Sequence, residues 1–156
     1  PLDSGTDVKL HVPALIPEQY LPDISTRLVL YKRIAKAGSE EDLREIQVEM
    51  IDRFGLLPEP TKNLFTCALL RISAQRLGIG EIDMTEEGGS IEFKPATVVE
   101  PAAIVTLIQS DPQRYRISGN NKLRVTATLP TLESRTAFIE TLLDPWLASI
   151  PREASG

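Results

Sequence analysis

The chain has one cysteine, Cys67, and one histidine, His11, among its 156 residues. A lone cysteine cannot form an internal disulfide, which favours a reducing, cytoplasmic location. The common zinc sites require several His and Cys ligands together, so they are excluded. Most Ser-His-Asp and Cys-His catalytic schemes are excluded too, unless His11 lies beside a nucleophile.

Long hydrophobic runs and a basic excess are also missing. No apolar run approaches the ~20 residues that a membrane helix needs. Lys and Arg number 17 against 22 Asp and Glu, giving a formal net charge of −5. Dedicated nucleic-acid-binding proteins normally carry a basic excess. We therefore expect no membrane association and no strong direct DNA binding.

The composition is that of an ordinary globular domain, with 42% hydrophobic and 25% charged residues. The start, Pro1-Leu2-Asp3-Ser4, has no initiator Met and no secretory signal, which suggests a piece of a longer protein. We expect an N-terminal arm over residues 1–22, one domain over 23–150 and a short tail over 151–156. The arm combines a loose polar start, an alternating strand at 7–12 and a proline-rich connector.

Three helices follow the connector. Their capping residues are Asp23 or Ser25 for the first, Ser39 for the second, and prolines in the first turn of the third. Gly38, Gly55 and Gly78 end them. The apolar stripe of the first helix is expected to contain Ile24, Leu28, Tyr31, Ile34 and Ala35.

The second half alternates hairpins with helices. Hairpins are expected over 79–93, with a turn at Glu87-Gly88-Gly89, and over 115–125. Helices are expected over 98–109 and from Thr131, the latter broken or kinked by Pro145. Trp146 fits a hydrophobic anchor or a partner contact equally well. The predicted fold class is α+β, with helices packed on a small sheet that contains two hairpins.

Four carboxylates share one face of the second helix. At about 100° per residue they lie opposite its apolar seam; they are Glu41, Glu45, Glu49 and Asp52. Such a stripe is either a solvated helix face or an acidic docking surface for a basic partner. A metal site is disfavoured because one helix face does not converge its oxygens.

A small basic group marks the second hairpin: Arg114, Arg116, Lys122 and Arg124. Residues two apart on a strand face the same side, so these residues form either a solvated face or a phosphate contact. No Gly-rich nucleotide motif is present, and we expect no cofactor. With no catalytic constellation in view, the sequence predicts a non-enzyme.

Two blocks of sequence are distinctive as a pair. One contains Pro13-Ala14-Leu15-Ile16-Pro17 and Tyr31-Lys32-Arg33-Ile34-Ala35; the other is Glu49-Met50-Ile51-Asp52-Arg53-Phe54-Gly55 with Leu57-Pro58. With Leu77-Gly78-Ile79 and Gly88-Gly89, they closely resemble the C-terminal domain of the bacterial transcription-repair coupling factors (Mfd). The resemblance is dense over residues 7–94 and fades toward the end.

The resemblance implies a role in transcription-coupled DNA repair. By this resemblance, the chain would belong to a larger parent protein, a multidomain ATP-driven DNA translocase that displaces stalled RNA polymerase and recruits the damage sensor UvrA. The C-terminal domain carries no motor. It packs on the parent's UvrB-like module, covers the UvrA-binding surface, and is released when the motor engages polymerase.

The family's regulatory contact maps onto the VEMIDRFG segment. The resemblance implies that Glu49 and Asp52 face basic residues of the UvrB-like module, with Arg53 beside them; Glu45 is added from helical spacing. The expected function is thus an autoinhibitory domain. The alternative is a weak nucleic-acid or protein docking module that uses the basic hairpin 114–124.

Overall fold

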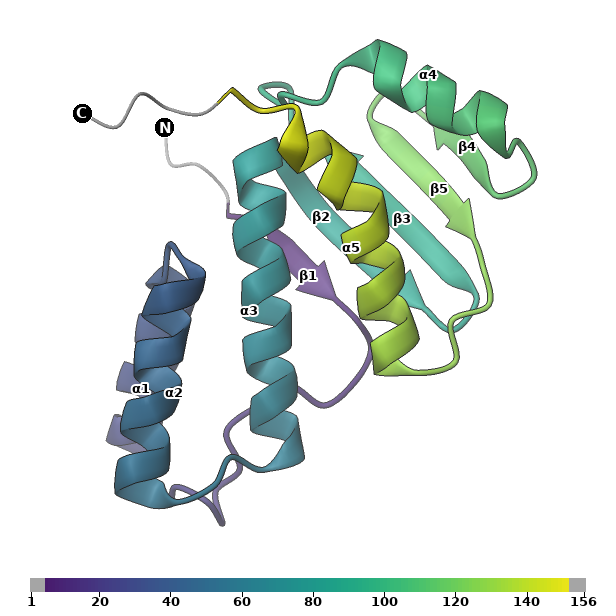
Figure 1. The fold of residues 1–156 in the computed structure, drawn as a ribbon. Coiled ribbons are helices and arrows are strands. Elements are labelled where there is room, and N and C mark those ends of the chain that lie inside the picture. The colour runs from purple at the N-terminus through teal and green to yellow at the C-terminus, as the bar shows by residue number, and fades with distance from the viewer. Residues whose placement is uncertain (1–4, 152–156) are drawn as a thin grey trace. The chain divides into compact units, whose positions relative to one another are not determined.

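The computed structural model describes residues 5–151, which form two compact units (Figure 1). A helical unit contains residues 11–72, and a sheet unit contains residues 5–10 together with 73–151. The loose start expected before residue 5 and the expected tail beyond Pro151 lie outside the described residues. No helix in residues 5–151 is long and apolar enough to cross a membrane.

The helical unit contains α1 (Ile24–Lys36), α2 (Glu40–Phe54) and most of α3 (Glu59–Leu77). Side-chain caps fix the first two starts, as the sequence predicts. The Asp23 carboxylate accepts from the backbone N–H of Thr26 at 2.9 Å, and the Ser39 hydroxyl accepts from the N–H of Asp42 at 3.1 Å. Each cap satisfies an N–H that the helix itself leaves unbonded.

The proline-rich connector belongs to the core of this unit. Ile16 and Leu21 are only 3% and 1% exposed, and they pack with apolar residues of all three helices. The backbone N–H of Ile16 donates to the Tyr31 hydroxyl at 2.7 Å. The connector, expected as part of an arm, therefore contributes Ile16 and Leu21 to the core of the helical unit, whereas Leu15 is 43% exposed.

The expected apolar stripe of α1 is partly wrong. Ile34 is buried and Tyr31 half-buried, but Ile24 and Leu28 are 63% and 56% exposed, and Ala35 is exposed too. Leu30 takes their place in the core. The five expected residues span a wide arc of the helix, and packing against α2 and the connector uses only one side of that arc.

The sheet unit holds a five-stranded mixed sheet in the order β1-β2-β3-β5-β4. Its strands are β1 (Asp7–Lys9), β2 (Ile79–Thr85), β3 (Gly88–Phe93), β4 (Tyr115–Ser118) and β5 (Lys122–Thr126). The pair β1–β2 is parallel, and the other pairs are antiparallel. The α+β class and both expected hairpins are confirmed.

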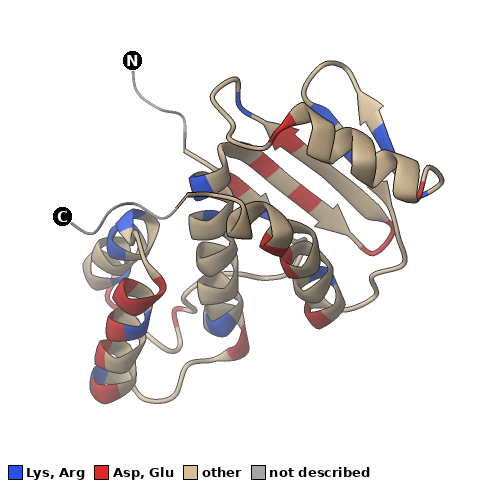
Figure 2. Cartoon of the chain, turned by 45° about the horizontal axis from the view of Figure 1, so that its top comes forward, with Lys and Arg blue, Asp and Glu red and all other residues tan. Residues whose placement is uncertain are grey.

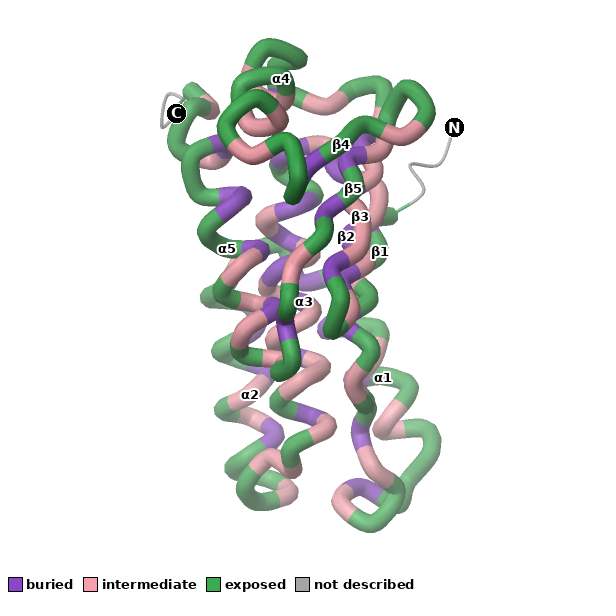
Figure 3. The backbone as a smooth tube through the Cα atoms, turned by 90° about the vertical axis from the view of Figure 1, so that its right-hand side faces the viewer, coloured by how far each residue is buried: buried purple, intermediate pink, exposed green. Residues whose placement is uncertain are grey.

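Buried and less buried residues alternate along the strands (Figure 3). Ile82, Ile91 and Leu123 are neighbours in register and fully buried. This face packs against α5 (Leu132–Ala148) and the last turn of α3, residues 73–77, while α4 (Pro101–Ser110) lies along β4 on the same side (Figure 1). The opposite face, which we call the open face, is polar.

The glycine pair begins β3 instead of forming the turn, which is made by Glu86 and Glu87. Gly88 has φ = 107°, a left-handed conformation, and a Cβ atom there would collide with the backbone carbonyl of Val125. A Cβ on Gly89 would collide with the carbonyl of Asp83 in the same way. The pair is therefore required by close backbone approach on both sides of β3.

Helix α5 runs through Pro145, which was expected to break or kink it. Proline removes one N–H that would bond the carbonyl of Thr141, but Thr141 is exposed and water can bond it. Trp146 then packs inward, with its ring 5.8 Å from that of Phe93 and only 8% of its surface exposed. Trp146 is thus a hydrophobic anchor of the helix.

One buried cation joins three segments of the sheet unit. The Arg135 side chain, 7% exposed, donates from Nε to the Leu129 carbonyl at 3.0 Å and from Nη1 to the Leu10 carbonyl at 2.9 Å. These bonds hold the chain after β1 and the loop before α5 against the helix.

Gly88→Ala should lower the free energy of unfolding by about 2 kcal/mol or more, because it combines a left-handed φ with a backbone collision. Gly119→Ala is the matched control, since Gly119 has φ = 67° but open space around it. That control should lose about 1 kcal/mol. Urea denaturation measures both, and equal losses would contradict the role assigned to close approach.

Arg135→Met keeps the length of the side chain but removes both donors. The buried carbonyls of Leu10 and Leu129 then lose their bonds, so we expect a loss of about 2 kcal/mol in urea denaturation. Arg76→Met, at an exposed position, should change stability by less than about 0.5 kcal/mol. If Arg135→Met lowers the free energy of unfolding as little as the control does, water must replace the hydrogen bonds of the guanidinium.

Candidate interaction surface on helix α2

The side chains of α2 separate into a buried seam and an exposed acidic face. Leu43, Ile46 and Met50 are at most 5% exposed and pack in the core of the helical unit. We define the acidic face as the four carboxylates that the sequence predicted on the other side: Glu41, Glu45, Glu49 and Asp52. Three of them are exposed and Glu49 is half-buried.

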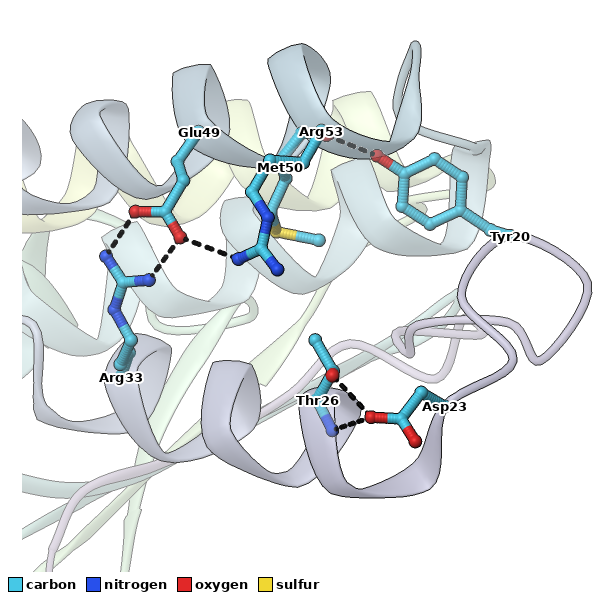
Figure 4. A network of polar contacts seen from close by, with 7 residues as sticks. All are labelled: Tyr20, Asp23, Thr26, Arg33, Glu49, Met50 and Arg53. Atoms are coloured by element: carbon cyan, nitrogen blue, oxygen red, sulfur yellow. Dashed lines mark hydrogen bonds and ion pairs between the residues drawn. The ribbon is translucent and has the colours of Figure 1, made fainter.

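Glu49 is the one member of the acidic face that is already paired (Figure 4). Its Oε2 and Oε1 atoms accept from both terminal nitrogens of Arg33, on α1, at 2.7 and 3.1 Å. Arg53, one turn further along α2, adds a contact of 3.4 Å to Oε2. A planar guanidinium matches a carboxylate in this two-bond geometry, which fixes both side chains.

This pairing changes the acidity of Glu49. The hydrogen bond from Arg33 is the main cause that lowers the pKa of the Glu49 carboxyl, and Arg53 adds to it. The same bond raises the pKa of the Arg33 guanidinium. The stabilisation from this pair is therefore present above the unfolded-state pKa of Glu49. It is lost as the pH falls through the lowered folded-state value.

Glu45 and Asp52 differ from Glu49, because neither has an ion pair or side-chain hydrogen bond within residues 5–151. Both border Val48, which is 53% exposed. The face is hollowed into a shallow depression of about 550 Å³, lined by Glu41, Arg44, Glu45, Val48, Glu49, Asp52 and Arg53. It thus offers an apolar centre with unpaired carboxylates around it.

The C-terminal end of α2 is held from the connector. The Tyr20 hydroxyl donates to the Gly55 carbonyl at 2.8 Å and approaches the Met50 carbonyl at 3.3 Å. The Tyr20 and Phe54 rings meet edge to face at 6.1 Å, and the Arg53 guanidinium lies 4.8 Å from the Phe54 ring centroid. Arg53 is therefore a positioned side chain at the edge of the acidic face.

Two features of this surface were not predicted from the sequence. The contact between Arg33 and Glu49 joins two helices, so no local sequence pattern indicates it. Val48 could have been found, because it lies three or four residues from Glu45 and Asp52 on the helix.

The acidic face of α2 is suited to recognising a positively charged partner. Cys67 is half-buried, and burial raises the pKa of its thiol, which disfavours the reactive thiolate. Within residues 5–151, no three His, Cys, Asp or Glu residues are grouped to hold a metal ion.

Comparison with known proteins identifies relatives. A family model described as the TRCF domain matches residues 10–104, which include all of α2. The transcription-repair-coupling factor of Escherichia coli K12 is 45% identical over 134 residues, covering 86% of this chain. That of Haemophilus influenzae is 44% identical over 137 residues, covering 88%. The chain spans only 12% of the length of these two relatives.

The fold has a counterpart among solved structures. The crystal structure of a C-terminal domain of a transcription-repair coupling factor matches with a TM-score of 0.71 at 17% identity, covering 94% of this chain and 97% of that one. At this identity, the match shows a shared fold. With the family model and the two close relatives, it leads to one conclusion: the chain belongs to the TRCF domain family of the transcription-repair-coupling factors.

Proposed function

We propose that this chain is a non-catalytic, autoinhibitory domain of a cytoplasmic transcription-repair coupling factor. It covers the UvrA-binding surface of the parent's UvrB-like module until RNA polymerase is engaged. The acidic face of α2 makes the contact, with Glu45, Glu49 and Asp52 opposite basic residues of that module and Arg53 at the border. One observation supports this proposal above the others. The carboxylates of Glu45 and Asp52 have no partner within residues 5–151, and they lie on either side of the exposed Val48.

A polar contact suits a surface that must be released. Interfaces between domains of one chain are smaller and more polar than permanent ones, so they open readily. Exposed charge pairs each contribute little, which keeps the contact reversible. In the parent, the tether raises the effective concentration to the millimolar range, so a weak contact is sufficient.

Glu49 plays a conditional part in this contact. In the free domain, its carboxylate is held by Arg33, so a cation of the module must displace Arg33 before it can pair with Glu49. Glu45 and Asp52 need no such exchange. We infer that these two carboxylates form the first contacts and that Glu49 joins once Arg33 is displaced.

Charge reversal on the acidic face tests the proposed contact. Glu49→Lys with Asp52→Lys should abolish salt-sensitive binding to the separately expressed UvrB-like module, measured by calorimetry at low and moderate salt. Two attractive pairs become repulsive. The matched control is Glu140→Lys with Asp144→Lys, two exposed carboxylates on α5 that give the same change in net charge. Equal weakening by both double variants would exclude a specific role for α2.

Removing Arg33 tests the conditional part of Glu49. Arg33→Gln frees Glu49 and removes a cation from the border of the acidic face, so binding to the basic module should tighten by about 2- to 5-fold. In the free domain, the pKa of Glu49 should rise toward its ordinary value in an NMR titration. Weaker binding in this variant would instead show that Arg33 orients Glu49 for the partner.

A further inference from the structure

The open face of the sheet has its charges sorted by strand. One half, on β1, β2 and β3, carries carboxylates: Asp7, Glu81, Asp83 and Glu92. The other half, on β4 and β5, carries cations: Arg116, Lys122 and Arg124. Strand register places these residues on one face, because each lies beside or between residues that point to the buried core. Figure 2 shows red bands on the strands away from β4 and a blue band on β4.

The acidic half is partly neutralised within the sheet. Lys9, on β1, donates to the Glu81 carboxylate at 3.3 Å. This hydrogen bond is the main cause that raises the pKa of Lys9, and the charges of Asp7 and Asp83 add to it. Asp7, Glu81 and Glu92 lie side by side in register across β1, β2 and β3, so this half of the face is acidic.

In the basic half, Lys122 lies directly opposite Glu92 on β3, an opposite-charge neighbour, whereas the two arginines face each other. Arg116 lies directly opposite Arg124, and Lys122 lies opposite Ser118. Within the described chain, none of these three cations has an ion pair or a side-chain hydrogen bond. Like charges directly opposite on neighbouring strands are destabilising, so an external anion would relieve this pair. Arg114 differs, because it pairs with Asp111 at 3.4 Å.

The order of charges selects the kind of partner. Neighbouring strands are about 4.8 Å apart, so the carboxylates of β2 lie roughly 10 Å from β5 and 15 Å from β4. A nucleic acid presents phosphates at even spacing and meets repulsion from the acidic half. A protein segment can present carboxylates to the arginines, in two-bond geometry, and cations to the carboxylates of β2 and β3.

We propose that the open face of the sheet is a second docking surface, which binds a protein segment with acidic residues followed about 10 Å away by basic ones. The acidic residues lie over Arg116 and Arg124, and the basic residues lie over Glu81 and Glu92. This surface is separate from the acidic face of α2 and does not depend on its role.

The test adds three probes in turn to this chain at low salt. Binding is measured by the change in the NMR chemical shifts of the backbone amides. The first probe is a peptide with a run of glutamates followed by a run of lysines. The second has the same composition in alternating order, and the third is a short DNA duplex. We expect the first peptide to shift amides of β2, β4 and β5, and to bind at least about 5-fold more tightly than the alternating peptide.

Arg116→Glu with Arg124→Glu should abolish these shifts. Lys32→Glu with Lys36→Glu, at exposed positions on α1, is the control with the same change in net charge and should leave them intact. The charge-reversal variant could lose binding because it misfolds. The milder variant Arg116→Gln with Arg124→Gln is therefore included, and it should also lose binding.

Several outcomes would overturn the proposal. Equal binding of the alternating peptide would show that charge order does not matter. Stronger binding of the duplex, lost with the same arginines, would identify a nucleic-acid surface. Absence of binding by the first peptide, or binding that survives both arginine variants, would exclude the open face as its site.

Discussion

The contact between Glu49 and Arg33 sets the distribution of charge on the acidic face of α2. It joins α1 to α2 through two hydrogen bonds of one guanidinium, at 2.7 and 3.1 Å. It also divides the acidic face: Glu49 is paired, whereas Glu45 and Asp52 have no ion pair or side-chain hydrogen bond within residues 5–151. In the proposed contact, an incoming basic surface would therefore meet Glu45 and Asp52 beside Val48 first, and Glu49 would become available only by exchange with Arg33.

Two periodicities produce the two charged surfaces of the molecule. The 3.6-residue period of α2 brings carboxylates three and four residues apart onto one face. The two-residue period of the strands does the same for the open face, where cations gather on β4 and β5. The surfaces differ in character: the α2 face has an apolar centre and an acidic border, whereas the sheet face is polar throughout and carries both signs of charge.

Much of the fold is readable from local signals. Ser39 and Thr131 cap their helices as expected, Gly55 follows the end of α2, and the two hairpins are marked by alternation. The acidic face of α2 also follows from the sequence alone, because helical spacing fixes which residues share a side. In each case the signal lies within a few residues of the feature it predicts.

The failures have one physical origin, which is tertiary context. Leu30 replaces Leu28 in the core because packing against α2 and the connector selects the buried side of α1. Pro145 is tolerated because the carbonyl that it leaves unbonded, on Thr141, is exposed to water, and Trp146 anchors the helix against Phe93. Gly88 is required by the carbonyl of a strand that follows much later in the chain. The partner of Glu49 lies on another helix, so helical spacing on α2 cannot reveal it.

The most direct test of the proposed role is capture of UvrA by the intact parent protein in the absence of RNA polymerase. The parent carrying Glu45→Lys, Glu49→Lys and Asp52→Lys should capture UvrA more strongly than the unmodified parent, because the domain no longer covers the UvrB-like module. If capture does not increase while the variant stays folded, autoinhibition through the acidic face of α2 is contradicted.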